Sequence, residues 1–249
     1  MKSVSISKLI TINKLSTHQL ESLVFENSNT FLLKNLFQRE LKTSDKGLEV
    51  GSNNYISKSS HYVMRSKALQ SHSYIPQLDI DSFVPVNPSA FKQYNLKKGD
   101  ILISKDSNIG EVVILDKDYP NFMYSGAMYK LPLDKHKYYV LAMLKSKIFR
   151  NQLDLMVPRG ATIRHAGTKF LDCAIPFPLG RNSAETINYI EILTKAIINK
   201  EIAIKDKDEK IKLLIEVELE QNQKQNTFHY EYPTLDLIKN RGRLDVGLY

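Results

Sequence analysis

The chain has 249 residues, of which 42% are hydrophobic and 25% are charged, and these proportions are typical of a globular protein. No run of about 18 apolar residues is present, which argues against a membrane-spanning helix. The one cysteine, Cys173, excludes an internal disulfide and lies in an apolar context that favours a buried, inert thiol. Because the N-terminus also lacks the pattern of a secretory signal, we expect a cytoplasmic protein.

The formal net charge of +8 is unevenly distributed along the chain. Residues 1–178 carry 24 Lys and Arg against 15 Asp and Glu, whereas residues 179–249 carry 11 against 12. A positive field in one part of a chain favours a polyanion partner such as nucleic acid. A lysine-rich composition without any such partner is the alternative, and charge alone does not choose between them.

The first two thirds of the chain predict a mostly β domain. Residues 30–36 fit a short strand or helix, and residues 48–133 alternate short Tyr-, Val- and Ile-rich segments with turn-forming residues. Within them, KKGDILISKDSNIGEVVIL (residues 97–115) contains two apolar runs around a polar loop, with Gly99 and Gly110 at its ends. Two strands and a loop account for this pattern.

The segments that follow the β domain differ in character. Residues 136–155 lack Gly and Pro and repeat apolar residues at helical spacing, which predicts one amphipathic helix. A basic, glycine-broken segment follows, and LDCAIPFPL (residues 171–179) predicts a strand that ends at Pro176 and Pro178.

Residues 183 to about 225 predict a single long helix, because they contain neither Gly nor Pro and begin with Ser183, a suitable N-cap. Such a helix would be about 60 Å long. Four isoleucines lie one heptad apart and are candidates for helix pairing: Ile190, Ile197, Ile204 and Ile211. The alternative is a helix folded back onto its own β domain. We therefore expect an α+β protein with a domain at 1–180, a spacer or dimerisation helix at 181–226 and a tail at 227–249.

Motifs for catalysis are not evident. The six histidines form no metal-binding pattern, no phosphate-binding glycine loop is present, and the carboxylates at 206–209 fit a solvated helix face. The sequence therefore predicts a binding or assembly protein with no catalytic residue, metal or cofactor.

Basic residues interleaved with Gly and Thr are the best candidates for DNA contacts, since such segments suit phosphate oxygens and base edges. A charged surface loop without a partner is the alternative. We expect base-edge contacts from Arg164, His165 and Lys105, and phosphate contacts from Ser104, Thr162 and Lys169. Further candidates are Tyr62, Arg65, Lys67, Asn108 and Arg159.

The order of these pieces resembles the DNA specificity subunit of type I restriction–modification systems. The matching elements are LKKGDILIS (96–104), NIG (108–110), GATIRH (160–165) and IPFP (175–178), followed at once by a long helix. The resemblance implies a non-catalytic target recognition domain that binds half of a bipartite double-stranded DNA site. It also implies methyltransferase and restriction/translocase subunits as partners.

The resemblance also bears on organisation. Residues 231–233 and 243–245 are similar to the opening of a second recognition domain, so we expect half of a subunit, either an N-terminal fragment or a half-subunit that pairs with itself through its helix. Two other readings stay open: a protein-interaction scaffold based on the long helix, and a fragment of a fused restriction–methylation enzyme.

Overall fold

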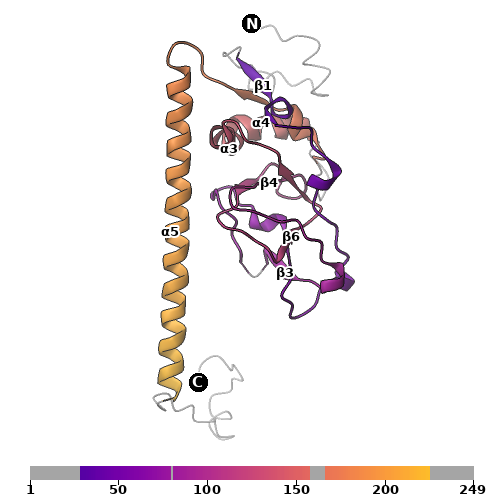
Figure 1. The fold of residues 1–249 in the computed structure, drawn as a ribbon, viewed down its shortest axis with the longest axis vertical. Coiled ribbons are helices and arrows are strands. Elements are labelled where there is room, and N and C mark those ends of the chain that lie inside the picture. Colours follow the sequence, from indigo (N-terminus) through magenta and orange to yellow (C-terminus); the bar gives the residue numbers. More distant parts are fainter. Residues whose placement is uncertain (1–28, 80, 158–165, 225–249) are drawn as a thin grey trace, which may run out of the picture. The chain divides into compact units, whose positions relative to one another are not determined.

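The computed structural model describes residues 29–79, 81–157 and 166–224, and its main elements are labelled in Figure 1. It confirms the predicted α+β class, with short strands followed by a long helix. The chain divides into two compact units, Met1–Ile202 and Ala203–Tyr249. No helix within the described ranges is both long and apolar enough to cross a membrane.

Short strands form three small sheets in the described part of the chain. Their orders are β1–β8, β3–β2–β6 and β5–β4–β7, and only the β2–β6 pairing among them is parallel. The bounds are β1 Thr30–Leu32, β2 Tyr62–Met64, β3 Phe83–Pro85, β4 Ile101–Ser104, β5 Val112–Ile114, β6 Phe122–Tyr124, β7 Met128–Leu131 and β8 Ala174–Pro176.

The β4–β5 hairpin confirms the two strands predicted from the apolar runs. Ile101 and Ile103 point into the largest core cluster, whereas Leu102 belongs to a second cluster on the other face. On β5, Val112 and Val113 divide between the two clusters in the same way. Because both faces are buried, the strands are apolar throughout instead of alternating with polar residues.

Two helices, α3 (Lys137–Lys145) and α4 (Lys147–Met156), replace the single helix expected over 136–155. The break is at Ser146, whose backbone is extended (φ −78°, ψ 158°) and whose hydroxyl and N–H both donate to the carbonyl oxygen of Met143. A serine that binds the preceding turn competes with helix continuation, and a sequence period cannot register such an interruption.

The helix α5 (Ser183–Lys224) confirms the long helix and begins at the predicted serine. Within the first unit, apolar side chains spaced by three, eight and four residues, all of which fit one helix face, pack on the largest core cluster: Ile187, Ile190, Ile198 and Ile202. Other side chains of α5 are exposed, including Ile197, Ile204 and Ile211. The four-isoleucine series therefore divides within the first unit, since Ile190 packs on the core and Ile197 is exposed.

Strand pairing joins the beginning and the end of the described domain. Thr30 lies opposite Pro176 and Leu32 opposite Ala174 in the β1–β8 pair. Cys173, directly before β8, is fully buried, and burial raises the pKa of its thiol far above the ordinary value. The expected inert thiol is thus confirmed, because only the thiolate is reactive.

Candidate nucleic-acid interface

The turn at Lys97–Asp100 explains why the LKKGD segment has its particular residues. The Asp100 carboxylate accepts the Lys97 N–H at 2.9 Å and the Lys130 ammonium at 3.3 Å, which closes the turn. Gly99 has a φ of +86°, a conformation that favours glycine. Its N–H donates to the Leu115 carbonyl oxygen at 2.8 Å, which joins the turn to the end of β5.

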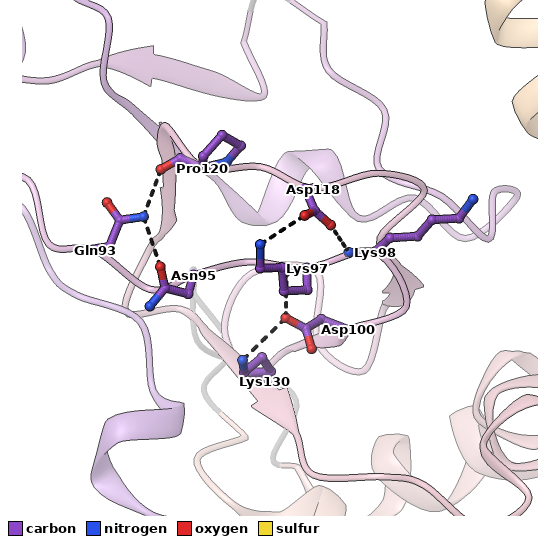
Figure 2. Close-up of polar contacts among 8 residues, drawn as sticks. All are labelled: Gln93, Asn95, Lys97, Lys98, Asp100, Asp118, Pro120 and Lys130. Atoms are coloured by element: carbon purple, nitrogen blue, oxygen red, sulfur yellow. Dashed lines mark hydrogen bonds and ion pairs between the residues drawn. The ribbon is translucent and has the colours of Figure 1, made fainter.

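A second carboxylate stabilises the same turn (Figure 2). Asp118 accepts the Lys98 N–H at 2.8 Å and the Lys97 ammonium at 2.9 Å. These two contacts, the backbone one first, lower the pKa of the Asp118 carboxyl below its ordinary value. The framework of the hairpin is therefore fixed at the end of β4 that lies away from its polar loop.

The loop after β4 is folded back on itself. The Gly110 N–H donates to the Ser104 carbonyl oxygen, and the Ser104 N–H donates to the Glu111 carbonyl oxygen, both at 2.8 Å. Gly110 has a φ of +75°, and a Cβ there would lie 2.3 Å from Cδ1 of Leu153. The loop thus rests closely on α4.

Three predicted contact residues belong to this loop. The Ser104 hydroxyl is fully buried and donates to the Asp106 carbonyl oxygen at 2.7 Å, so a phosphate contact by it would require the loop to move. Lys105 is largely buried and forms an ion pair with Asp106. Asn108 is partly exposed. Of the three residues, Asn108 is the one that lines the pocket beside this loop.

That pocket has a volume of about 270 Å³ and is mainly polar. Its lining comes from the loop after β4, from α4 and from the segment after the short 3-10 helix η4 (Ser66–Ala68): Gln70, Ser71, Ser107, Asn108, Ile109, Glu111 and Arg150. The Arg150 guanidinium donates to the Ile109 carbonyl oxygen and to the Glu111 carboxylate. Amides, hydroxyls and a guanidinium are the groups that proteins use to read base edges.

Sequence reasoning did not single out Gln70, Ser71 or Arg150 for this pocket. Nothing in the spacing of Arg150 shows that it reaches a loop about 40 residues earlier. The residues Gln70 and Ser71 carry no motif at all. Only tertiary packing brings these side chains together.

The other candidate cluster lies at β2 and η4. The Tyr62 ring stacks on Phe122 with centroids 5.1 Å apart, and the Arg65 guanidinium lies 5.5 Å from the centre of the Tyr55 ring. Lys67 forms an exposed ion pair with Asp81 at 3.2 Å. Such exposed pairs are weak, so the Lys67 ammonium can exchange partners at low cost.

The predicted basic segment is only partly described. The Lys169 ammonium donates to the Met156 carbonyl oxygen at 2.8 Å and thereby satisfies the C-terminal end of α4. Arg159, Thr162, Arg164 and His165 lie outside the described residues.

Lys145, a partly buried lysine beside the pocket, was not among the predicted site residues. The Lys145 ammonium donates to the Gln70 carbonyl oxygen at 2.6 Å, and burial lowers its pKa to about 8 although Glu111 and Glu201 oppose the shift. Glu201 on α5 accepts hydrogen bonds from the Ser73 hydroxyl and the Tyr74 N–H, each at 2.9 Å. The segment at 70–75 is thus held between α3 and α5.

No group of three or more His, Cys, Asp or Glu side chains that could hold a metal ion occurs in the described ranges.

Comparisons with solved structures find 23 matching chains, three of which follow. One is the type I restriction–modification system S subunit from M. genitalium, with 19% identity, a TM-score of 0.46 and coverage of 81% of this chain. A second belongs to a study of complex assembly and conformational transition of the type I R-M system, with 14% identity, a TM-score of 0.44 and 84% coverage. The third is the HsdS subunit from Thermoanaerobacter tengcongensis, with 14% identity, a TM-score of 0.43 and 80% coverage.

This chain spans about half the length of each of these proteins, covering 46%, 49% and 45% of them. No curated protein matches the sequence. The family model described as "Type I restriction modification DNA specificity domain" matches residues 26–212, which is most of the chain. The chain therefore belongs to the family of type I restriction–modification DNA specificity domains.

Proposed function

We propose that this chain is a non-catalytic DNA recognition component of a type I restriction–modification enzyme. The observation that carries the proposal is the family match over residues 26–212. In this role the domain binds one half of a bipartite double-stranded site and positions methyltransferase and restriction subunits. The excess of basic residues in 1–178 supports the DNA partner, since cations that neutralise phosphates supply most of the affinity for a duplex.

The polar pocket beside the β4–β5 hairpin is our first choice for base reading among the described residues. Asn108 suits adenine, because a side-chain amide can donate to and accept from that base edge. Arg164, His165 and Lys105 stay proposed base contacts. Ser104, Thr162 and Lys169 stay proposed phosphate contacts. Four further residues stay proposed DNA contacts: Tyr62, Arg65, Lys67 and Arg159.

The exposed apolar side chains of α5 support a further part of the proposal, pairing with a second helix. Ile204 is 67% exposed and Ile211 is 56% exposed. Apolar residues repeated at heptad spacing on an exposed helix favour pairing with another helix. A second copy of this chain would supply such a helix and a second recognition domain.

Selection from a random duplex library tests the proposed function. We expect enrichment of a short motif, and an affinity that falls steeply with added salt. Asn108→Ala should weaken the selected duplex by about 1–3 kcal/mol while leaving random duplexes unchanged, and Asn35→Ala, an exposed asparagine on another segment, serves as the matched control. Absence of an enriched motif together with a shallow salt dependence would contradict the proposal and favour a helix-based scaffold.

A further inference from the structure

Three lysines from separate segments meet beside the Lys97–Asp100 turn. A Cβ on Gly99 would lie 3.2 Å from the Lys137 ammonium, so this group of α3 rests against the turn that carries Lys98. The ammonium groups of Lys137 and Lys195 lie 5.4 Å and 4.7 Å from the centre of one aromatic ring, that of Tyr138. Like charges are thus gathered from the turn, α3 and α5.

Lys97 of the turn and Lys130 of β7 form ion pairs, whereas these three lysines form none with the carboxylates of the described residues. Lys97 pairs with Asp118 at 2.9 Å and Lys130 with Asp100 at 3.3 Å. Figure 2 shows the Lys98 side chain extending away from the Asp118 carboxylate that its own N–H binds. None of the carboxylates within the described ranges forms an ion pair with Lys98, Lys137 or Lys195. The contacts with Tyr138 stabilise the ammonium groups but leave their charge in place.

Beside these lysines lies a pocket of about 220 Å³ with a partly apolar lining, and Gly99, which the Lys137 ammonium approaches, is one of its lining residues. Ile114 and Leu115 of the hairpin and Ile198 and Ile202 of α5 contribute the apolar part, and Lys98 and Lys195 also line it. Asp116 is the one acidic lining residue, and its buried carboxylate accepts the Tyr119 hydroxyl at 2.6 Å. The volume suits one side chain of leucine or phenylalanine size.

We propose that this pocket binds an acidic segment of a partner protein, which places one apolar side chain among the isoleucines and its carboxylates against Lys98, Lys137 and Lys195. We choose an acidic partner because its negative charges would complement those of the three lysines. A phosphate alone would use the lysines and leave the apolar lining uncovered, whereas a peptide uses both. The pocket also lies at the opposite end of β4 from the proposed base-reading loop, about 13 Å along the strand, so both sites can be occupied together.

A defined peptide tests the proposal with the full chain. The probe is the blocked pentapeptide Asp-Glu-Leu-Asp-Glu, and its binding is followed by calorimetry and by ¹H–¹⁵N shifts. We expect saturable binding with shifts centred on Gly99 and Lys195. Replacing Leu by Ser in the peptide, or its acids by Asn and Gln, should each weaken binding at least several-fold. Shifts elsewhere on the protein, or no saturable binding, would overturn the proposal.

Paired variants separate this site from general charge. In the first, Lys98, Lys137 and Lys195 are all changed to Gln. In the second, three exposed lysines that do not line the pocket, Lys34, Lys210 and Lys212, are changed to Gln. Both lose three positive charges. We expect the first to bind the peptide about tenfold more weakly and the second to bind it like the unaltered chain.

Duplex binding by the same variants tests whether these lysines contact DNA phosphates instead of an acidic peptide. We expect the salt dependence of duplex affinity to change equally in both variants. A salt slope that falls by about 3 in the first variant alone would show that these lysines contact DNA phosphates and would overturn the proposal. Equal peptide affinity in the two variants would overturn it as well, while the proposed DNA recognition would stand.

Discussion

The backbone N–H of Tyr74 donates to Oε2 of Glu201 at 2.9 Å, which joins a loop of the β domain to the long helix α5. The same oxygen accepts the Ser73 hydroxyl at 2.9 Å and the Ile75 N–H at 3.3 Å. Several donors on one carboxylate hold the two segments in a fixed relative position, because each donor restricts the orientation of the carboxylate. They also contribute to stability. This contact orients the first turns of α5 on the domain.

Glu201→Ala should therefore destabilise the fold, because the Tyr74 N–H loses its acceptor and the Ile75 N–H keeps only the Ser73 hydroxyl oxygen. We expect a loss of about 1–3 kcal/mol in the free energy of unfolding, measured by urea denaturation. Glu201→Gln should lose less, since its amide oxygen can still accept. Glu209→Ala, on an exposed part of α5, is the control, and equal stability of the Glu201→Ala and Glu209→Ala variants would contradict the prediction.

Gly110→Ala should destabilise the loop after β4. A Cβ there would lie 2.3 Å from Cδ1 of Leu153, and the φ of +75° adds a cost of about 1–2 kcal/mol for any L-residue. The expected result is a lower thermal midpoint than that of Gly51→Ala, where no atom lies within 4 Å of the added methyl group. The prediction fails if the two midpoints agree.

Acid should weaken the fold through Asp45. Arg39 contributes most to lowering the pKa of this carboxyl, and the Lys42 N–H adds to the effect although burial opposes it. A carboxyl whose folded pKa is lowered stabilises the fold above its unfolded pKa and loses that contribution as pH falls through the folded value. Asp45→Asn should therefore be less stable than the unaltered chain at pH 6, and the difference should shrink below about pH 4.

The test of the Asp45 prediction is urea denaturation as a function of pH. The buried Asp45 accepts two hydrogen bonds from Arg39, at 2.6 and 2.7 Å, whereas Asp172 forms an exposed pair with Lys34. Asp172→Asn is thus the matched control and should show little change at either pH. A difference that stayed constant between pH 6 and pH 3 would refute this assignment.

Lys145 predicts that stability also rises with pH in the alkaline range, for a different reason. Burial lowers its pKa to about 8, below the value of about 10.4 for a free lysine, so the unfolded chain binds more protons between these values. The contribution of Lys145 to stability should rise with pH across this window. We expect the stability difference between the unaltered chain and Lys145→Met to grow in favour of the unaltered chain from pH 8 to 10, with exposed Lys147→Met as control.

Much of the framework could be predicted from the sequence because its signals are local. The strands at Ile101–Ser104 and Val112–Ile114 follow from uninterrupted apolar runs, and α5 follows from 42 residues without Gly or Pro. Gly99 and Gly110 were recognised as turn positions because positive φ favours glycine. The interruption at Ser146 was missed, since it depends on one hydroxyl that bonds to its own helix.

The sites were less predictable because they depend on tertiary contacts. Arg150 reaches the loop after β4 from α4, and Glu201 reaches Tyr74 over 127 residues. The heptad pattern indicated that Ile190 belongs with Ile197, yet only the packing of α5 shows that the first contacts the core and the second is exposed. Periodicity identifies a helix face, but it does not say which neighbour covers each residue.

The pairing of β1 with β8 brings the first and last strands of the domain side by side. The polypeptide enters the domain at Thr30 and leaves it at Pro176 on adjacent strands, which lie about 5 Å apart, and α5 begins seven residues later. A foreign domain that ends in the same pair of strands would thus lead into the helix at an unchanged point. Because entry and exit lie at one edge, we expect residues 30–176 to be exchangeable as a unit without moving the start of α5.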